Sequence, residues 1–165
     1  FSCMAALCLL PLSGTEIVRS ESSLNKRLFL HVDGLTYHFN NKRDQRLNEF
    51  NYGLGFSYFL GTLKSDFTLL NDFQVFAEAD VYSDSFSDFG YVLGASFQRP
   101  LSTHLNWGLH MGVIHEDNLE EKTDFYLYPF VFPYLQTNFD GVNMRISFIP
   151  PVHNKGIIAF QIILD

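Results

Sequence analysis

The sequence predicts an all-β protein, an eight-stranded antiparallel up-and-down transmembrane β-barrel with a short N-terminal periplasmic segment. Three observations support this fold class. Segments of about ten residues alternate between large apolar and small or polar side chains. Short and long breaks alternate between those segments. The composition is rich in aromatic rings and poor in charge.

The composition fits one domain whose surface faces lipid. The chain has 165 residues, of which 18% are charged and 16% aromatic, whereas an ordinary soluble domain has about 25% charged residues. The net charge of −7 argues against nucleic acid as a partner, since nucleic acid selects clusters of Lys and Arg. It also argues against general attraction to anionic lipid, so any contact with phosphate would be local or bridged by a divalent cation.

The first residues, 1–20, are predicted to be a signal peptide with a clipped N-terminus. Its apolar run, Met4–Leu12, is too short to span a bilayer as a helix, which needs about 20 residues. Cleavage after Gly14 or after Ser20 fits equally well, and a buried N-terminal helix is the alternative. Residues 21–165 then form a single outer-membrane barrel domain. Both cysteines would be removed with the signal, so no disulfide is expected.

Strand-like alternation is clearest in the segment Tyr52–Gly61. Its even positions carry large apolar side chains, and its odd positions are mostly Gly and Ser. The same pattern recurs along the chain. The eight predicted strands are roughly 28–39, 52–61, 67–82, 89–98, 104–116, 125–137, 142–149 and 157–164.

The breaks between these strands are of two kinds. Transmembrane barrels have short periplasmic turns and longer external loops, and an even number of strands closes without a free edge. The short breaks are 62–66, 99–103 and 138–141, and the longer or more charged ones are 40–51, 83–88, 117–124 and 150–156. The alternative is a soluble lipocalin-type barrel with its large apolar side chains inside. The face rich in Gly, Ser and Asn would then be a poor soluble exterior.

The strand order brings His38 and the pair Asp84-Ser85 to the same external rim. His38 shares a strand face with Gly34 and Thr36, which points it toward the lumen. An imidazole, a carboxylate and a hydroxyl that lie together can carry out acyl transfer. The same residues also fit a rim histidine beside an ordinary loop, because Asp-Ser is common in turns.

Short motifs in a conserved order and spacing resemble the lipid A palmitoyltransferase family. Leu35–His38, for example, is similar to the family's Ile-Thr-Trp-His, and Asp84–Phe86 resembles its Asp-Ser-Trp. The matching segments are Leu35–His38, Arg46–Glu49, Gly53–Phe56, Asp84–Phe86, Arg99–Leu101, Tyr128–Pro133, Ile149–Pro150 and Asn154–Gly156.

The resemblance implies a phospholipid:lipid A acyltransferase in the outer membrane of a Gram-negative bacterium. The family moves a palmitoyl chain from a phospholipid to a hydroxyl on lipid A, the lipid of lipopolysaccharide. His38 would be the general base, Asp84 its orienter, and Ser85 a nucleophile or an oxyanion-side donor. The acyl chain would lie inside a partly apolar lumen. The protein is expected to act as a monomer, without a cofactor or a metal.

The resemblance also implies openings in the barrel wall. Pro133 and Pro150 match family prolines beside a wall gap, although ordinary turn prolines are the alternative reading. A second family gap is also flanked by prolines, and Asp33 and Asn51 occupy those positions here. Phospholipid would therefore enter differently at that seam, or the seam would be opened by other means.

Further substrate contacts are expected from the same comparison of motifs. Ser96 aligns with the glycine on the floor that sets acyl-chain length, so a chain somewhat shorter than palmitoyl is expected. Independently of the resemblance, Lys42, Arg43 and Arg46 follow His38 in the first external loop. They could meet lipid A phosphates, directly or alongside Mg²⁺, or form an ordinary solvated loop of mixed charge. The family's periplasmic helix would be reduced to Thr15–Lys26.

Two other functions remain open at this stage. A similar rim histidine and serine could remove an acyl chain from lipid A, which would make the protein a deacylase. A non-catalytic structural or lipid-binding barrel could retain the same scaffold.

Overall fold

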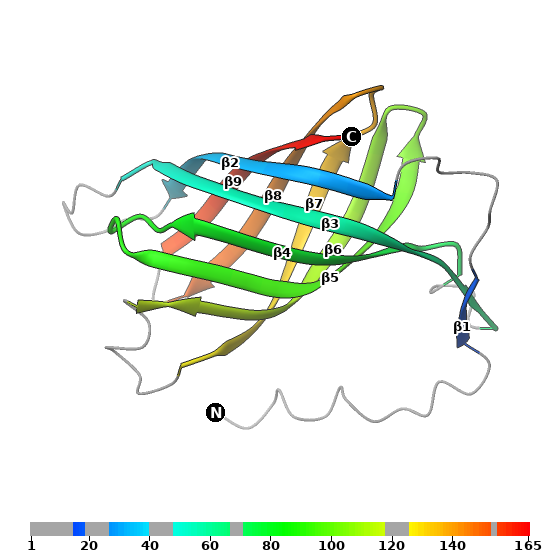
Figure 1. The fold of residues 1–165 in the computed structure, drawn as a ribbon, viewed down its shortest axis with the longest axis horizontal. Helices are drawn as coiled ribbons and strands as arrows, with labels where there is room; N and C mark the ends of the chain where they lie inside the picture. The colour runs from blue at the N-terminus through cyan, green and yellow to red at the C-terminus, as the bar shows by residue number, and fades with distance from the viewer. Residues whose placement is uncertain (1–14, 19–26, 40–47, 67–70, 118–125, 153–154) are drawn as a thin grey trace.

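The computed structural model describes residues 15–18, 27–39, 48–66, 71–117, 126–152 and 155–165. Eight antiparallel strands close into a barrel, in the order β3-β2-β9-β8-β7-β6-β5-β4 with β4 returning to β3 (Figure 1). The strands are β1 Thr15–Val18, β2 Leu28–Phe39, β3 Phe50–Ser65, β4 Gln74–Ser83, β5 Phe89–Ser102, β6 Leu105–Glu116, β7 Tyr128–Thr137, β8 Val142–Val152 and β9 Lys155–Leu164. The predicted eight-stranded up-and-down fold is confirmed. Within the described ranges, no helix is long and apolar enough to cross a membrane.

The barrel has two distinct ends. We call the end where β2, β4, β6 and β8 finish the loop rim, and the end where β3, β5 and β7 finish the turn rim. His38 stands at the loop rim, near the end of β2. The barrel's first strand starts and its last strand finishes at the turn rim, as predicted (Figure 1).

The N-terminal segment differs from the expected helix. Thr15–Val18 is the short strand β1, which pairs with the end of β3 from Thr15↔Ser65 to Val18↔Thr62. The partner strand therefore runs past the predicted end at Gly61. Residues 1–14 and 19–26, which hold the predicted signal cleavage sites and the rest of the predicted helix, lie outside the described residues.

The outward face of the barrel is apolar. Large side chains there are about half exposed, whereas a soluble lipocalin-type barrel would turn them inward. They include Leu28, Leu30, Leu35, Tyr37, Tyr52, Leu54, Phe56, Val81, Leu93, Val131, Leu135, Val142, Met144, Phe148 and Ile162. This exterior suits lipid and supports the transmembrane reading of the sequence pattern.

Polar side chains occupy much of the lumen. Glycines on the inward face make room for them: a Cβ at Gly55 would overlap the Asp80 carboxylate, and one at Gly108 would overlap the Tyr134 ring. The buried polar residues that face inward include His31, Ser57, Glu78, Asp80, Ser96, Gln98, Asn106, Gln136, Asn143 and Arg145. The small side chains of the sequence pattern therefore accommodate large neighbours from adjacent strands.

A β-bulge at Gly34 sets the orientation of the upper part of β2. The register against both neighbouring strands shifts between Asp33 and Leu35. The extra residue lets Asp33 and Thr36, three positions apart, both face the lumen. His38 follows Thr36 in phase, so the predicted inward orientation of His38 is confirmed by its contact with Ser85.

Strand pairing is incomplete along one seam, and we call the unpaired stretch between β7 and β8 the open seam. β7 and β8 pair from Tyr134↔Ser147 to Gln136↔Arg145, whereas β7 pairs with β6 along its whole length. Toward the loop rim, the pairing with β8 stops at Pro133, and Pro150 lies on the facing stretch of β8. Proline has no amide hydrogen to donate, which explains why the ladder ends there.

The seam beside Asp33 and Asn51 is closed. β2 and β3 pair from Leu28↔Tyr58 to Leu35↔Phe50, and the Thr36 amide donates a hydrogen bond to the Glu49 carbonyl at 2.8 Å. Asp33 thus keeps its strand pairing with Gly53, whereas Asn51 lies in the stretch where the register shifts.

Candidate active site at the loop rim

Two predicted residues from distant parts of the chain meet at the loop rim. His38 Nε2 lies 2.8 Å from Ser85 Oγ. β2 delivers the histidine, and the turn after β4 delivers the serine. A hydroxyl hydrogen-bonded to an imidazole nitrogen is the arrangement in which histidine can remove the hydroxyl proton.

The turn that carries Ser85 is held by the start of β3. The Asn48 amide donates to the Ser85 carbonyl at 2.9 Å, and Asn51 Nδ2 donates to Ser85 Oγ at 3.4 Å. Sequence reasoning noted Asn51 only as a position without the family's proline. Its contact with Ser85 was missed because a single amide at the start of a strand gives no signal of its partner.

Asp84 shapes the turn. Its side chain is 3% exposed, and its Oδ1 accepts hydrogen bonds from the amides of Phe86 at 2.8 Å and Asp88 at 2.9 Å. The resemblance implied instead that this carboxylate orients His38. Asp84 Oδ2 is buried without a hydrogen-bond partner among the described residues. Burial raises the pKa of this carboxyl group, against which the two amide hydrogen bonds act.

One side of the lumen near this site is apolar. His38 pairs with Ile157, and Ile157 pairs with Ile149, so the three side chains share a face. Across the open seam, the rings of Phe130 and Phe132 stack with centroids 4.6 Å apart. The partly apolar lumen that the resemblance implies is therefore present along β7, β8 and β9.

Ser96 does not form an open floor. It is fully buried, and its Oγ donates to Glu78 Oε1 at 2.6 Å. Arg145 binds the same carboxylate through two hydrogen bonds of 2.8 and 2.9 Å. Ser96 thus belongs to a charged network at that level of the lumen, and its expected role in setting acyl-chain length stays a prediction.

The remaining predicted contacts are less well placed. Pro133 is exposed on the outer face of β7, and Pro150 on that of β8, so both contribute to the seam and not to the lumen. Lys42, Arg43 and Arg46 lie outside the described residues. Among the residues that are described, no group of three or more His, Cys, Asp or Glu side chains is arranged to hold a metal ion.

The eight-stranded fold and its apolar outer face together define a β-barrel of the transmembrane type. It is similar to a solved structure described as "De novo design of transmembrane beta-barrels", with 11% sequence identity and a TM-score of 0.53. The match covers 84% of this chain and 93% of that one, and it concerns the fold alone. No family model matches the sequence, and no curated protein matches it.

Proposed function

We propose that this protein is an outer-membrane acyltransferase of a Gram-negative bacterium, moving a palmitoyl or somewhat shorter chain from a phospholipid to lipid A. The observation that carries the proposal is the 2.8 Å contact between His38 Nε2 and Ser85 Oγ. This pair lies at the rim of a barrel whose outer face suits lipid. A phospholipid ester and a lipid A hydroxyl in the same membrane can both reach it there.

Two reaction routes use this pair. In the first, Ser85 Oγ attacks the phospholipid ester carbonyl, its proton passes to His38, and the departing lysophospholipid takes that proton. The lipid A hydroxyl then attacks the acyl-Ser85 ester and restores the serine. In the second, His38 takes the proton of the lipid A hydroxyl, whose oxygen attacks the phospholipid ester carbonyl while Ser85 donates a hydrogen bond to the developing oxyanion. The bond to the lysophospholipid oxygen then breaks, and the lysophospholipid leaves with the proton from His38. A trapped acyl ester on Ser85 would distinguish the first route from the second.

The open seam supports a substrate that arrives from the membrane. β7 and β8 separate on the loop-rim side of Tyr134, in the half of the barrel that holds His38. The inward side chains beside that opening, including Phe130, Phe132 and Ile149, are apolar. An acyl chain that entered there would meet hydrocarbon before it reached the Glu78–Arg145 network.

Mass spectrometry of lipid A tests the proposal. Cells expressing the wild type should carry lipid A with one added acyl chain. His38→Ala and Ser85→Ala should each lower its formation by about 100-fold or more. His104→Ala is the matched control, since His104 stacks on Phe139 at the turn rim and should leave the added chain unchanged.

Other outcomes identify the alternatives. Loss of an acyl chain would indicate a lipid A deacylase. Unchanged lipid A in cells whose barrel is folded would indicate a structural or lipid-binding barrel. Full acyl transfer by His38→Ala would show that the site is wrongly assigned.

A further inference from the structure

A second serine, histidine and aspartate are aligned inside the barrel, away from the loop rim. His31 Nδ1 lies 2.7 Å from Asp80 Oδ1, and His31 Nε2 lies 2.9 Å from Ser57 Oγ. The three residues stand on β2, β3 and β4, which are neighbours in the barrel, and all three side chains are buried. This is the hydrogen-bond order of a serine hydrolase: nucleophile, base and carboxylate.

The hydrogen bonds of His31 accommodate the tautomer that a serine hydrolase uses. Asp80 Oδ1 also accepts a hydrogen bond from Gln161 Nε2 at 3.1 Å. When the neutral ring carries its proton on Nδ1, it donates to Asp80, and Nε2 accepts the hydroxyl proton of Ser57. That is the tautomer in which histidine activates a serine.

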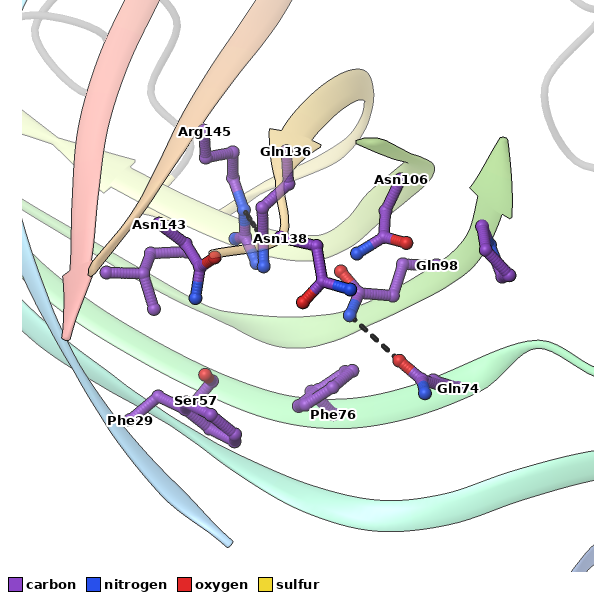
Figure 2. A pocket seen from close by; sticks show the side chains of 12 residues that line it. Phe29, Ser57, Gln74, Phe76, Gln98, Asn106, Gln136, Asn138, Asn143 and Arg145 are labelled. Atoms are coloured by element: carbon purple, nitrogen blue, oxygen red, sulfur yellow. Dashed lines mark hydrogen bonds between the residues drawn. The ribbon is translucent and has the colours of Figure 1, made fainter. Parts of the chain in front are cut away.

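Ser57 opens onto a cavity of about 310 Å³ in the turn-rim half of the lumen. Figure 2 shows amide side chains converging on this space, among them Gln98, Asn106 and Asn143. Asn138 and Pro100 also line it, and both are exposed at the turn rim. The cavity is therefore reached from the end of the barrel opposite His38.

The cavity offers donors for a carbonyl oxygen. Asn143 Oδ1 accepts the Phe139 amide at 2.8 Å, and Gln136 Oε1 accepts Arg145 Nε at 3.0 Å. The amide nitrogen is thus the end that each side chain can present to a ligand. Both amides line the same cavity as Ser57, and fixed donors of this kind can stabilise a developing oxyanion.

We propose that Ser57, His31 and Asp80 form a second active site, which hydrolyses short-chain acyl esters of small polar alcohols. Ser57 Oγ attacks the ester carbonyl and His31 Nε2 takes its proton. The carbon–oxygen bond to the alcohol breaks, and the alcohol leaves with the proton from His31. Water then attacks the acyl-Ser57 ester, giving its proton to His31, and the released Ser57 takes that proton back. The carboxylic acid departs.

The size and lining of the cavity define the substrate class. A volume of about 310 Å³ is at the lower end of ligand pockets, which run from about 300 to 1,000 Å³. A space of this size holds an acetyl or propionyl ester, and its amide-lined wall is a poor environment for a long acyl chain. The amide-rich lining favours an alcohol with hydroxyl groups, because each amide can donate and accept.

Covalent labelling of the wild-type barrel tests the proposal without any variant. Folded protein in detergent is treated with diisopropyl fluorophosphate, digested and mapped by mass spectrometry. The expected result is phosphorylation of Ser57. Labelling confined to Ser85, or no labelling of a folded barrel, overturns the proposal. Because the labelled peptide identifies the serine, the outcome is independent of acyl transfer at the loop rim.

Hydrolysis of p-nitrophenyl acetate supplies the second readout. Ser57→Ala and Asp80→Asn should each lower the rate of nitrophenolate release by about 100-fold or more. Ser102→Ala removes an exposed hydroxyl at the turn rim and should leave the rate unchanged. A folded Ser57→Ala barrel that hydrolyses the ester at the wild-type rate overturns the proposal.

Discussion

Gly55 shows how one small residue supports the polar interior. A Cβ at this position would overlap the Asp80 carboxylate and lie 2.7 Å from the Ala79 carbonyl oxygen. Asp80 is held by His31 and Gln161, so it has little room to move. The absence of a side chain at Gly55 is what allows this carboxylate to cross toward His31.

Gly55→Ala should therefore destabilise the barrel by about 1–3 kcal/mol, as overpacking of a filled interior does. Urea titration of the protein folded in detergent measures the change. Gly34→Ala is the matched control, because a Cβ at Gly34 meets nothing within 4 Å. Equal destabilisation by both substitutions would mean that glycine matters for backbone freedom and not for space.

Asp84 predicts a pH dependence of the loop-rim turn. Its folded-state pKa is raised by burial, so the folded protein binds a proton more readily than the unfolded chain does. Stability contributed by this group therefore rises as the pH falls through the raised pKa, and falls as the pH increases. Asp84→Asn keeps an oxygen for the amides of Phe86 and Asp88 and should remove this component.

The measurement is the free energy of unfolding of wild type and Asp84→Asn between pH 3 and pH 8. As the pH falls, the wild type should become more stable relative to Asp84→Asn. A difference that stays constant across the range would contradict the assigned effect of burial.

At the residue scale, the sequence predicted some contacts and missed others for identifiable reasons. Strand order was enough to bring His38 and Ser85 to the same rim, and face alternation pointed His38 inward, but neither pattern placed Ser85 beside it. The contact between His31 and Asp80 was not predictable, because it depends on the stagger between strands, which face alternation leaves open. The network around Ser96 was not predictable either, because Glu78 and Arg145, 67 positions apart, gave no sign of their pairing.

The two edges of β7 differ in strand pairing, and the prolines of β7 explain the difference. Pro129, Val131 and Pro133 have the same parity, so their backbone nitrogens point to the same edge of the strand. β7 keeps its pairing with β6 through both prolines. The missing donors therefore fall on the edge that faces β8, and the Val131 amide faces the open seam as well.

Hydrogen exchange measured by NMR in micelles should reveal this asymmetry. The Val131 amide should exchange at least about ten times faster than the Phe132 amide, which faces β6, and the Leu135 amide, which lies in the paired part of the seam. Similar protection of Val131 and Leu135 would show that the seam closes in solution.

At the element scale, strand positions were well predicted and strand ends less so. The predicted strand 28–39 coincides with β2. The predicted strand 67–82 begins later, at Gln74, because Asp72 adopts a positive φ of 66° in a turn. Lys64 also bonds to Asp72 across that turn. Alternation continued through Phe73, so the sequence pattern gave no sign of the turn.

The molecule as a whole is organised around an apolar exterior and a polar interior. Leu93 and Leu101 both lie on the outer face of β5 and are 51% and 58% exposed. Leu93 lies nearer the middle of the strand, whereas Leu101 lies at its turn-rim end. In a bilayer the first position faces hydrocarbon and the second approaches the interface.

Leu93→Arg should therefore cost about 2–4 kcal/mol of folding stability in lipid vesicles, and Leu101→Arg about 0–1 kcal/mol. Guanidinium titration followed by the fluorescence of Trp107, the one tryptophan of the chain, measures both. Equal costs at the two positions would contradict a membrane-spanning barrel. Unlike tests of the enzymatic proposals, this test concerns the placement of the whole barrel in lipid.

The bulge at Gly34 also affects how the protein tolerates insertions and deletions. Because β2 has one extra residue at the bulge, the side chains of His31 before it and His38 after it both point into the lumen. Deletion of Gly34 would rotate one half by one position, so that either His31 or His38 would point into the lipid. Deletion of this single residue would thus abolish one of the two proposed sites, at His31 or at His38, and leave the other facing the lumen. A point substitution at Gly34 keeps the number of residues in β2 and could not have this effect.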